Sequence, residues 1–405
     1  MRYGSDVNAD AVAEPRSHRD LSLDGLRGIA ALVVLVHHSL LVIPALAEPH
    51  ATGGHQTNGF GWAWWLTNTP LHTLWNGGEA VYVFFLLSGF VLMPRTVRVV
   101  AAWRSYYASR LLRLYIPVFV ATMLTLLMVF TVPRHSEPHA SWWLNAHAFA
   151  VSPTSVMRDA YLVRGTDWFN SAFWSLQWEV IFSIMLPVYV VFSRFARRLW
   201  VIKALALFVL IGLSAQFGHM GLTYLSMFAL GSLLAVERDK VMALVQRVSN
   251  RRPRIFWASI LVGTVLALNA SWLTSTQFAA NPRLGAAMVP IDVAGALLVM
   301  LIVLSWPAAR TSLARPTPQW LGSRSFSLYL VHEPLVVSIA LLLGPRLAPL
   351  TLVVAVPVAL LVTDLFYRLI ERPSHRLSKF IGARVAPSGL PATVTDSISA
   401  PWVAR

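Results

Sequence analysis

Three basic side chains interrupt an apolar stretch near the start of the chain. The segment LDGLRGIAALVVLVHHSL, residues 23–40, contains Arg27, His37 and His38. Arg27 and His38 are eleven residues apart, so on a helix they lie within about 20° of each other, whereas His37 lies about 80° away from Arg27. A neutral imidazole is well suited to proton transfer near neutral pH. The spacing predicts one helix face with Arg27 at an end and His38 about 16 Å further along.

A purely structural role is the alternative for His38 and for Arg27. His38 could bond to a neighbouring helix, and Arg27 could anchor the end of a membrane span. Ionisable groups at membrane depth are costly, however, at ~2.5–3.5 kcal/mol for Arg, Lys or Asp on insertion scales, and they commonly mark functional sites. Both interpretations stay open for His38 taken alone.

Two further arginines could bind a phosphate. Arg110 and Arg113, in WRSYYASRLLRLYIP, are three residues apart and share a helix face. Guanidinium groups match the geometry of phosphate oxygens, although topology and anionic lipid would also explain the pair. Together with Arg27 and His38, the pair predicts a phosphorylated donor that enters from the cytoplasm and carries its reactive end into the membrane.

Polar residues in two later apolar segments could complete this chemistry. Glu179, in FNSAFWSLQWEVIF, lies about 10 Å into its span and needs a partner such as a His or an Arg, or a raised pKa. His332 and Glu333 precede Pro334, which can kink a helix so that polar groups line a cavity. Glu371 and Arg372 are expected to form ion pairs at the membrane interface.

Other classes of site lack support in the sequence. The chain has no cysteine, no Walker loop and no dinucleotide-binding glycine motif. His50, His55, His135 and His139 could be imagined as zinc ligands, but no H-E-x-x-H motif accompanies them, and no metal is expected. The net charge of +15 resides largely in short segments between apolar runs, which argues against a nucleic-acid partner.

The elements that must position these residues are membrane helices. Of the 405 residues, 56% are hydrophobic and only 13% are charged, compared with about a quarter charged in soluble domains. The composition predicts an all-α, polytopic membrane protein of about ten transmembrane helices. The apolar runs lie at about 28–47, 78–94, 114–132, 172–193, 199–217, 220–236, 256–273, 288–306, 324–344 and 348–370.

The distribution of positive charge orients these spans. With the N-terminus inside, the four inside loops contain five, three, six and two Lys or Arg residues, and each outside segment contains three or fewer. Both termini are therefore expected in the cytoplasm. Residues 1–20 and 376–405 are expected to be tails that flank a membrane domain at 21–375. Tryptophans in the outer segments, such as Trp75 and Trp143, favour an interfacial belt over a sugar-stacking platform.

The ordered motifs resemble a known family. LDGLRGIAALVVLVHHS, FFLLSGF, the Arg-x-x-Arg of Arg110 and Arg113, FWSLQWE, LYLVHEP and the closing ERP are similar to those of the acyltransferase-3 family, the bacterial integral membrane O-acyltransferases. The resemblance implies ten helices and the transfer of an acyl group, often acetyl, from acyl-CoA. It implies that Arg27 and His38 are needed for activity and that Arg110 and Arg113 handle the donor. Glu179 and His332 match recurrent family positions.

These inferences give one hypothesis and several rivals. We expect a multi-pass protein of the inner (plasma) membrane that uses acyl-CoA, with acetyl-CoA the first candidate, to acylate a carbohydrate or glycolipid. His38 would act as general base or transient acyl carrier, Arg27 would hold donor phosphate or stabilise negative charge, and Glu179 would orient a His or bind the sugar. The rivals are a proton-coupled transporter using His38, Glu179 and His332, an enzyme that acylates a cytoplasmic small molecule such as a macrolide, and a structural partner of an exporter. Acyl length, acceptor identity and oligomeric state stay open.

Overall fold

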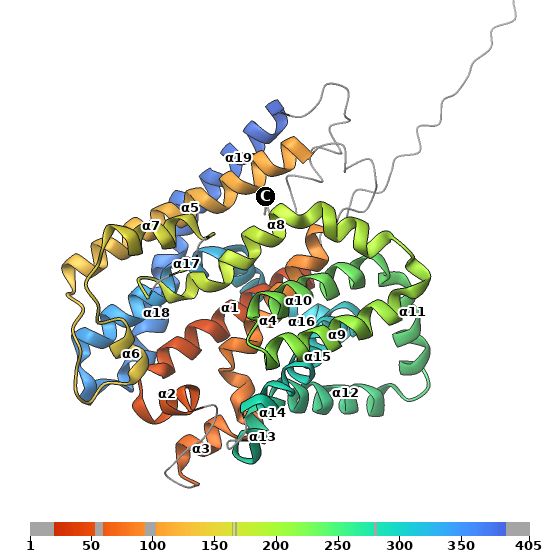
Figure 1. The fold of residues 1–405 in the computed structure, drawn as a ribbon, viewed down its shortest axis with the longest axis horizontal. Coiled ribbons are helices and arrows are strands. Elements are labelled where there is room, and N and C mark those ends of the chain that lie inside the picture. Colours follow the sequence, from red (N-terminus) through yellow and green to blue (C-terminus); the bar gives the residue numbers. More distant parts are fainter. Residues whose placement is uncertain are drawn as a thin grey trace, which may run out of the picture.

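The computed structural model describes residues 20–52, 60–93, 103–163, 165–166, 168–278 and 282–385. These residues form helices and loops without a β-strand, so the predicted all-α class is confirmed for them (Figure 1). The predicted N-terminal tail, apart from Asp20, and the last twenty residues of the predicted C-terminal tail lie outside the described residues. The membrane domain between them is built from the helices given below.

The longer helices follow the predicted apolar runs. They are α1 (Leu21–Leu41), α4 (Gly77–Leu92), α5 (Trp103–Thr131), α8 (Trp174–Arg194), α9 (Trp200–Gln216), α10 (Met220–Val236), α12 (Pro253–Leu268), α15 (Val289–Ser305), α17 (Pro316–Leu343) and α18 (Leu350–Phe366).

Shorter elements connect them. They are α2 (Pro44–Ala51), α3 (Trp62–Thr67), η1 (Pro70–Leu74), α6 (Trp142–Ala146), α7 (Pro153–Tyr161), η3 (Ser171–Phe173), η4 (Arg197–Leu199), α11 (Arg238–Ser249), α13 (Ala270–Phe278), α14 (Pro282–Ala286), α16 (Pro307–Leu313), η5 (Pro345–Leu347), η6 (Tyr367–Glu371) and α19 (Arg372–Val385).

Within the part of the chain that the structure describes, six helical segments are long and apolar enough to cross a membrane, and there are up to eight if each of two bent pairs counts as one span. The bent pairs are α10 with α11, at 77°, and α15 with α16, at 88°. The apolar helices α4 and α12 are shorter, with 16 residues each. The protein is therefore a multi-pass membrane protein, while the count of ten crossings and the cytoplasmic termini stay predictions.

The first helix begins seven residues before the predicted span. Asp20 is its N-cap, and the Asp20 side chain accepts a hydrogen bond from the backbone N–H of Ser22 at 3.2 Å. The helix ends at Leu41, and Pro44 starts α2 at its first position, where a proline needs no hydrogen-bond donor. Arg27 consequently lies in the second turn of α1, inside the helix and not at its edge.

Helix α1 packs most extensively against α17, and it also contacts α4 and α18. Two glycines allow the close crossing with α17. A Cβ added to Gly28 would lie 2.4 Å from the backbone nitrogen of Gly322, and one added to Gly322 would lie 2.1 Å from the carbonyl oxygen of Asp24. Small residues at such crossings let two backbones approach in membranes. The crossing brings the polar residues of α1 and α17 together.

The C-terminal helix closes the side of the domain that carries α5. Figure 1 shows α19 alongside α5, and the hydroxyl of Ser105 donates a hydrogen bond to the carbonyl of Gly382 at 2.7 Å. The element η6 between α18 and α19 is a single π-helical segment, a feature that often occurs at functional sites. Helix α19 continues ten residues beyond the predicted end of the membrane domain at 375.

Candidate active site

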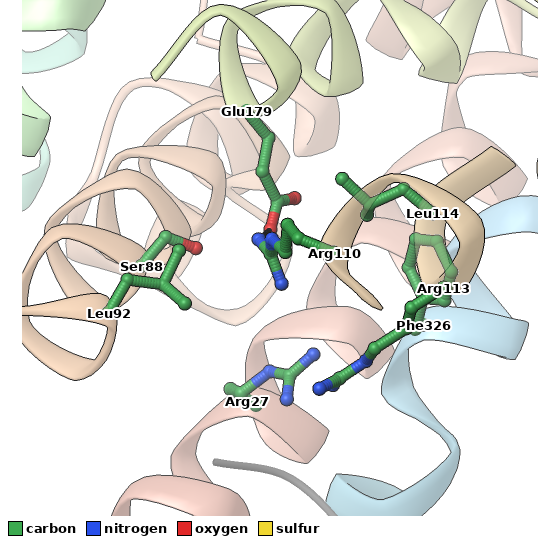
Figure 2. A pocket seen from close by; sticks show the side chains of 8 residues that line it. All are labelled: Arg27, Ser88, Leu92, Arg110, Arg113, Leu114, Glu179 and Phe326. Carbon is green, nitrogen blue, oxygen red and sulfur yellow. Dashed lines mark hydrogen bonds and ion pairs between the residues drawn. The ribbon is translucent and has the colours of Figure 1, made fainter. Parts of the chain in front are cut away.

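Three arginines from two helices converge on one pocket. Arg27 of α1 and Arg110 and Arg113 of α5 line a cavity of about 350 Å³, its open mouth included, together with Glu179 of α8. Figure 2 shows the guanidinium groups of Arg27 and Arg113 directed toward each other and the Glu179 carboxylate on Arg110. The remaining lining residues are Ser88, Leu92, Leu114 and Phe326. The predicted combination of Arg27 with the Arg-x-x-Arg pair therefore exists as one cluster.

Glu179 forms an ion pair in this pocket. Its Oε1 lies 2.6 Å from Nη2 of Arg110, and Arg110 also donates from Nε to the hydroxyl of Ser183 at 3.2 Å. The expectation that Glu179 has an arginine or histidine partner is met by Arg110. The carboxylate of Glu179 thus contacts an arginine and not a histidine, and binding of a sugar by Glu179 stays a prediction.

The other arginine of the pair has a neutral partner that sequence reasoning missed. Nε of Arg113 donates to Nε2 of His375 at 3.1 Å. Glu371 lies behind His375, with 3.6 Å between Oε1 and Nε2, and it accepts a hydrogen bond from the backbone N–H of Ser327 at 3.0 Å. Glu371 is 3% exposed, so the expected interfacial pairing of Glu371 is wrong: this last residue of η6 is buried, within electrostatic reach of Arg113 and Arg27.

The second cluster contains His38 and His332, which the sequence analysis proposed as site residues. Nδ1 of His38 lies 2.8 Å from Nε2 of His332 on α17. Nδ1 of His332 faces the backbone carbonyls of Leu328 and Tyr329 at 3.0 and 2.9 Å, and carbonyls only accept hydrogen bonds. In the neutral pair, His332 therefore carries its proton on Nδ1 and accepts the Nδ1 proton of His38. This arrangement leaves Nε2 of His38 unprotonated, as a general base requires.

His37 occupies a different environment. Its Nδ1 lies 2.9 Å from the carbonyl oxygen of Trp75, and its ring lies against the Cα of Gly77, where a Cβ would come within 2.5 Å of it. The helical spacing predicted that His37 and His38 face apart, and their contacts confirm this. His37 is held by Trp75 and by Gly77 at the start of α4, and His38 by His332 of α17.

A buried ionic layer lies beside the histidine pair. Glu333 accepts hydrogen bonds from the hydroxyl of Ser171 at 2.6 Å, from the backbone N–H groups of Ser171 and Ala172, and from Nε2 of His147 at 2.7 Å. Nδ1 of His147 contacts the carbonyl of Trp143 at 2.8 Å. Both ring nitrogens of His147 therefore face oxygen acceptors, and the contact with Glu333 is buried, with side chains 2% and 1% exposed.

Trp143 connects this layer to His38. Its ring is nearly parallel to that of His38, with 5.4 Å between ring centroids and 14° between planes. The ring of His332 lies 5.0 Å from that of His38, at 17°. Neither His147 nor Trp143 was selected as a site residue from the sequence, because each lies in an outer segment whose aromatic residues are typical of a membrane interface.

Helix α1 joins the two clusters. The eleven residues from Arg27 to His38 correspond to about 16 Å along the helix axis. One end of the site offers cationic groups in a cavity, and the other offers an oriented imidazole with a free lone pair. Such a site can bind an anionic group at one end and remove a proton from a hydroxyl at the other.

Comparisons with known proteins agree with this chemistry. The chain is 26% identical to the acyltransferase MdmB of Streptomyces mycarofaciens over 408 residues, covering 94% of this chain and 97% of that protein. It is 24% identical to the O-acetyltransferase PaAT-1 of Phomopsis amygdali over 448 residues, covering 91% of this chain and 85% of the relative. No solved structure matches. The model of the acyltransferase domain family, acyltransferase-3, matches residues 20–368. The chain therefore belongs to the acyltransferase-3 family and is a multi-pass membrane O-acyltransferase.

Proposed function

We propose that this protein transfers an acyl group from cytoplasmic acyl-CoA, with acetyl-CoA the first candidate, to a hydroxyl of a glycan or glycolipid. It would act in the inner (plasma) membrane with ten spans and both termini in the cytoplasm. The single observation that carries the proposal is the hydrogen bond between His38 and His332, which fixes a basic nitrogen on the helix that also carries Arg27. The name of one relative, an O-acetyltransferase, is consistent with an acetyl donor.

The arginine pocket suits the diphosphate of CoA. Arg27, Arg110 and Arg113 lie within electrostatic reach of one another, and such a cluster of like charges is stabilised by an anion. Glu179 compensates the charge of Arg110 at 2.6 Å, whereas the hydrogen bond from Arg113 to His375 ends on a neutral ring nitrogen. Arg27 and Arg113, whose guanidinium groups face each other in the cavity (Figure 2), are the proposed phosphate ligands, and Arg110 is held in place by Glu179.

The distance between the two clusters supports separate roles for them. About 16 Å of helix separates Arg27 from His38, so Arg27 serves the donor phosphates and not the negative charge that develops at the carbonyl. The pantetheine arm of CoA would extend from the arginines toward His38 and place the thioester there.

The reaction follows from the protonation state of His38. Nε2 takes the proton of the acceptor hydroxyl while its oxygen attacks the thioester carbonyl. The carbon–sulfur bond then breaks, and the imidazolium returns the proton to the departing thiolate, so an ester and CoA thiol form with no net proton release. His332 supports this cycle because its Nε2 lone pair faces the Nδ1 proton of His38 and stabilises the imidazolium. In this cycle His38 is a general base and carries no acyl group.

The transporter alternative receives less support. It requires His38, Glu179 and His332 to form one relay, but the Glu179 carboxylate pairs with Arg110 in the arginine pocket. A cytoplasmic small-molecule acceptor uses the same donor site and the same base, so it differs only in what reaches His38.

The test is acyl transfer by the purified full-length protein in lipid nanodiscs. Labelled acetyl-CoA and longer acyl-CoAs would be supplied with and without candidate glycans, and CoA release and labelled product would be followed. We expect acceptor-dependent CoA release that His38→Ala abolishes and His37→Ala retains. Absence of both CoA binding and CoA release would overturn the proposal in favour of the transporter.

A further inference from the structure

One arginine outside the two clusters has a buried guanidinium group without a hydrogen-bond partner. Arg134 follows α5 in the outer segment, and all three of its guanidinium nitrogens are buried without a hydrogen bond. Among the residues that the structure describes, Arg134 is the one arginine with all three guanidinium nitrogens buried and without a hydrogen bond. Its neighbours are satisfied locally: His135 contacts the carbonyl of Pro133 at 3.0 Å and the carboxylate of Glu137 at 2.9 Å.

The carboxylate that attracts Arg134, that of Glu333, already accepts hydrogen bonds from other groups. Glu333 attracts Arg134 electrostatically, but its two oxygens accept hydrogen bonds from Ser171, Ala172 and His147. Burial lowers the pKa of Arg134 to about 10, and the attraction of Glu333 opposes that shift, so the guanidinium is charged at neutral pH. A buried cation with five unused N–H donors is unfavourable unless an acceptor of hydrogen bonds fills the site.

The position of Arg134 separates it from the donor pocket. It lies within electrostatic reach of Glu333, which follows His332 directly in the sequence and is bonded to His147 beside Trp143. The backbone of Glu137, three residues after Arg134, exchanges hydrogen bonds with the Asn145 side chain of α6 at 2.9 and 3.0 Å, and Trp143 of the same helix lies against His38. These contacts place the segment that carries Arg134 at the His38 end of the site, about 16 Å along α1 from Arg27. The CoA diphosphate that the proposed function places on Arg27 and Arg113 cannot also reach Arg134.

We infer that Arg134 binds an acidic group, a phosphate or a carboxylate, of the acceptor whose hydroxyl is acylated at His38. The inference rests on the proposed function and names the class of acceptor: a glycan or glycolipid that bears a negative charge close to the reactive hydroxyl. A planar guanidinium binds either group through two parallel N–H bonds. A neutral sugar would leave the charge of Arg134 uncompensated.

The test uses three small probes that share a sugar ring. Methyl glucoside is neutral, glucose 1-phosphate carries a phosphate, and methyl glucuronide carries a carboxylate. The thermal stability of the full-length protein in nanodiscs would be measured with each probe at matched ionic strength. Saturating CoA would be present throughout so that the arginine pocket does not bind the phosphate probe. The variants are Arg134→Gln and Arg134→Lys, with Arg346→Gln, an exposed arginine of η5, as the matched control.

We expect at least one anionic probe to stabilise the wild type and the Arg346→Gln control more than methyl glucoside does. Arg134→Gln should weaken this binding roughly tenfold or more, and Arg134→Lys should retain part of it. A stronger effect of the phosphate than of the carboxylate identifies a phosphate-bearing acceptor, and the reverse identifies an acidic sugar. Equal stabilisation by all three probes, no stabilisation, or no difference between wild type and Arg134→Gln would overturn the inference.

This experiment separates the inference from the proposed function. Binding of acetyl-CoA, measured on the same protein without sugar, does not involve Arg134. Loss of the anion effect with intact CoA binding and His38-dependent acyl transfer would remove the acceptor site alone. An Arg134-dependent anion effect in a protein that neither binds nor consumes acetyl-CoA would instead remove the proposed function.

Discussion

His38 and His332 are 294 residues apart in the chain, and their ring nitrogens lie 2.8 Å from each other. The hydrogen bonds of His332 to two backbone carbonyls determine the direction of this contact, because they require its proton on Nδ1. The pair is therefore a donor–acceptor arrangement with an unprotonated Nε2 on His38. A general base needs this tautomer to be held before substrate arrives.

Replacement of His38 should remove the chemistry and leave the fold. We expect His38→Ala to lower kcat by roughly 10²–10⁴-fold, the range for general-base catalysis. His37→Ala should retain most activity because the His37 ring contacts the carbonyl of Trp75 and not His332. Acyl transfer to a fixed acceptor measures both, with thermal unfolding as the control for folding. Equal activity of the two variants would remove His38 from the mechanism.

Replacement of His332 should act through His38. In His332→Ala the Nδ1 proton of His38 loses its acceptor, so we expect kcat to fall by roughly 10²-fold while KM for acetyl-CoA stays unchanged. Glutamine offers a carbonyl oxygen to the same proton, and His332→Gln should recover part of the rate. A rise in KM without a fall in kcat would assign His332 to donor binding instead.

The sequence alone was sufficient to predict where the longer helices lie and which ionisable residues they place in the membrane. Each predicted apolar run overlaps a helix, because length and hydropathy are local properties. The alignment of Arg27 with His38 follows from helical geometry alone. The start of α1 was placed too late because a predicted span marks only its apolar part, whereas the Asp20 cap extends the helix.

The partners of these residues depend on tertiary packing and could not be derived. Glu179 was expected in the outer half of the site, and only the approach of α8 to α5 shows that it pairs with Arg110. His375 follows the ERP motif and was overlooked because the π-helical segment that turns Glu371 inward has no recognised sequence signal. Trp143 and His147 carry a signal, adjacent aromatic and ionisable residues in an outer segment, but that signal is shared with membrane interfaces.

The crossing of α1 and α17 should be sensitive to a single methyl group. A Cβ at position 322 would lie 2.1 Å from the carbonyl oxygen of Asp24, so Gly322→Ala should push the helices apart, lower the thermal stability and weaken the contact between His38 and His332. Gly263→Ala on α12 is the matched control. No atom lies within 4 Å of a Cβ there, and alanine favours a helix over glycine by about 1 kcal/mol. Unfolding temperature and kcat report the two effects, and a neutral Gly322→Ala would show that the crossing is looser than described.

Comparing acetyl-CoA with acetyl-pantetheine, a shorter donor without the diphosphate, should show which arginines bind phosphate. We expect Arg113→Gln to raise KM for acetyl-CoA by roughly 10–100-fold, the loss of a charge-assisted hydrogen bond. The same variant should leave KM for acetyl-pantetheine unchanged, since that donor lacks the diphosphate. Arg104→Gln is the control, because Arg104 is an exposed residue of the same helix. An equal effect of Arg113→Gln on both donors would place Arg113 outside the phosphate site.

The ion pair between Arg110 and Glu179 should contribute to folding more than to phosphate binding. Its side chains are 7% and 24% exposed, and removing one partner of such a pair leaves an uncompensated charge in the bundle. We expect Arg110→Gln and Glu179→Gln each to lower stability by roughly 3 kcal/mol, the low end for a buried pair because Glu179 retains some solvent contact. The double variant should lose less than the sum, with a coupling of about 1–3 kcal/mol. Arg368→Gln, which breaks the pair with Asp364 at an arginine that is 64% exposed, should cost less than about 1 kcal/mol. Additive losses at positions 110 and 179 would mean that the two side chains are solvated separately, and Arg110 would then be available as a third ligand for the donor phosphates.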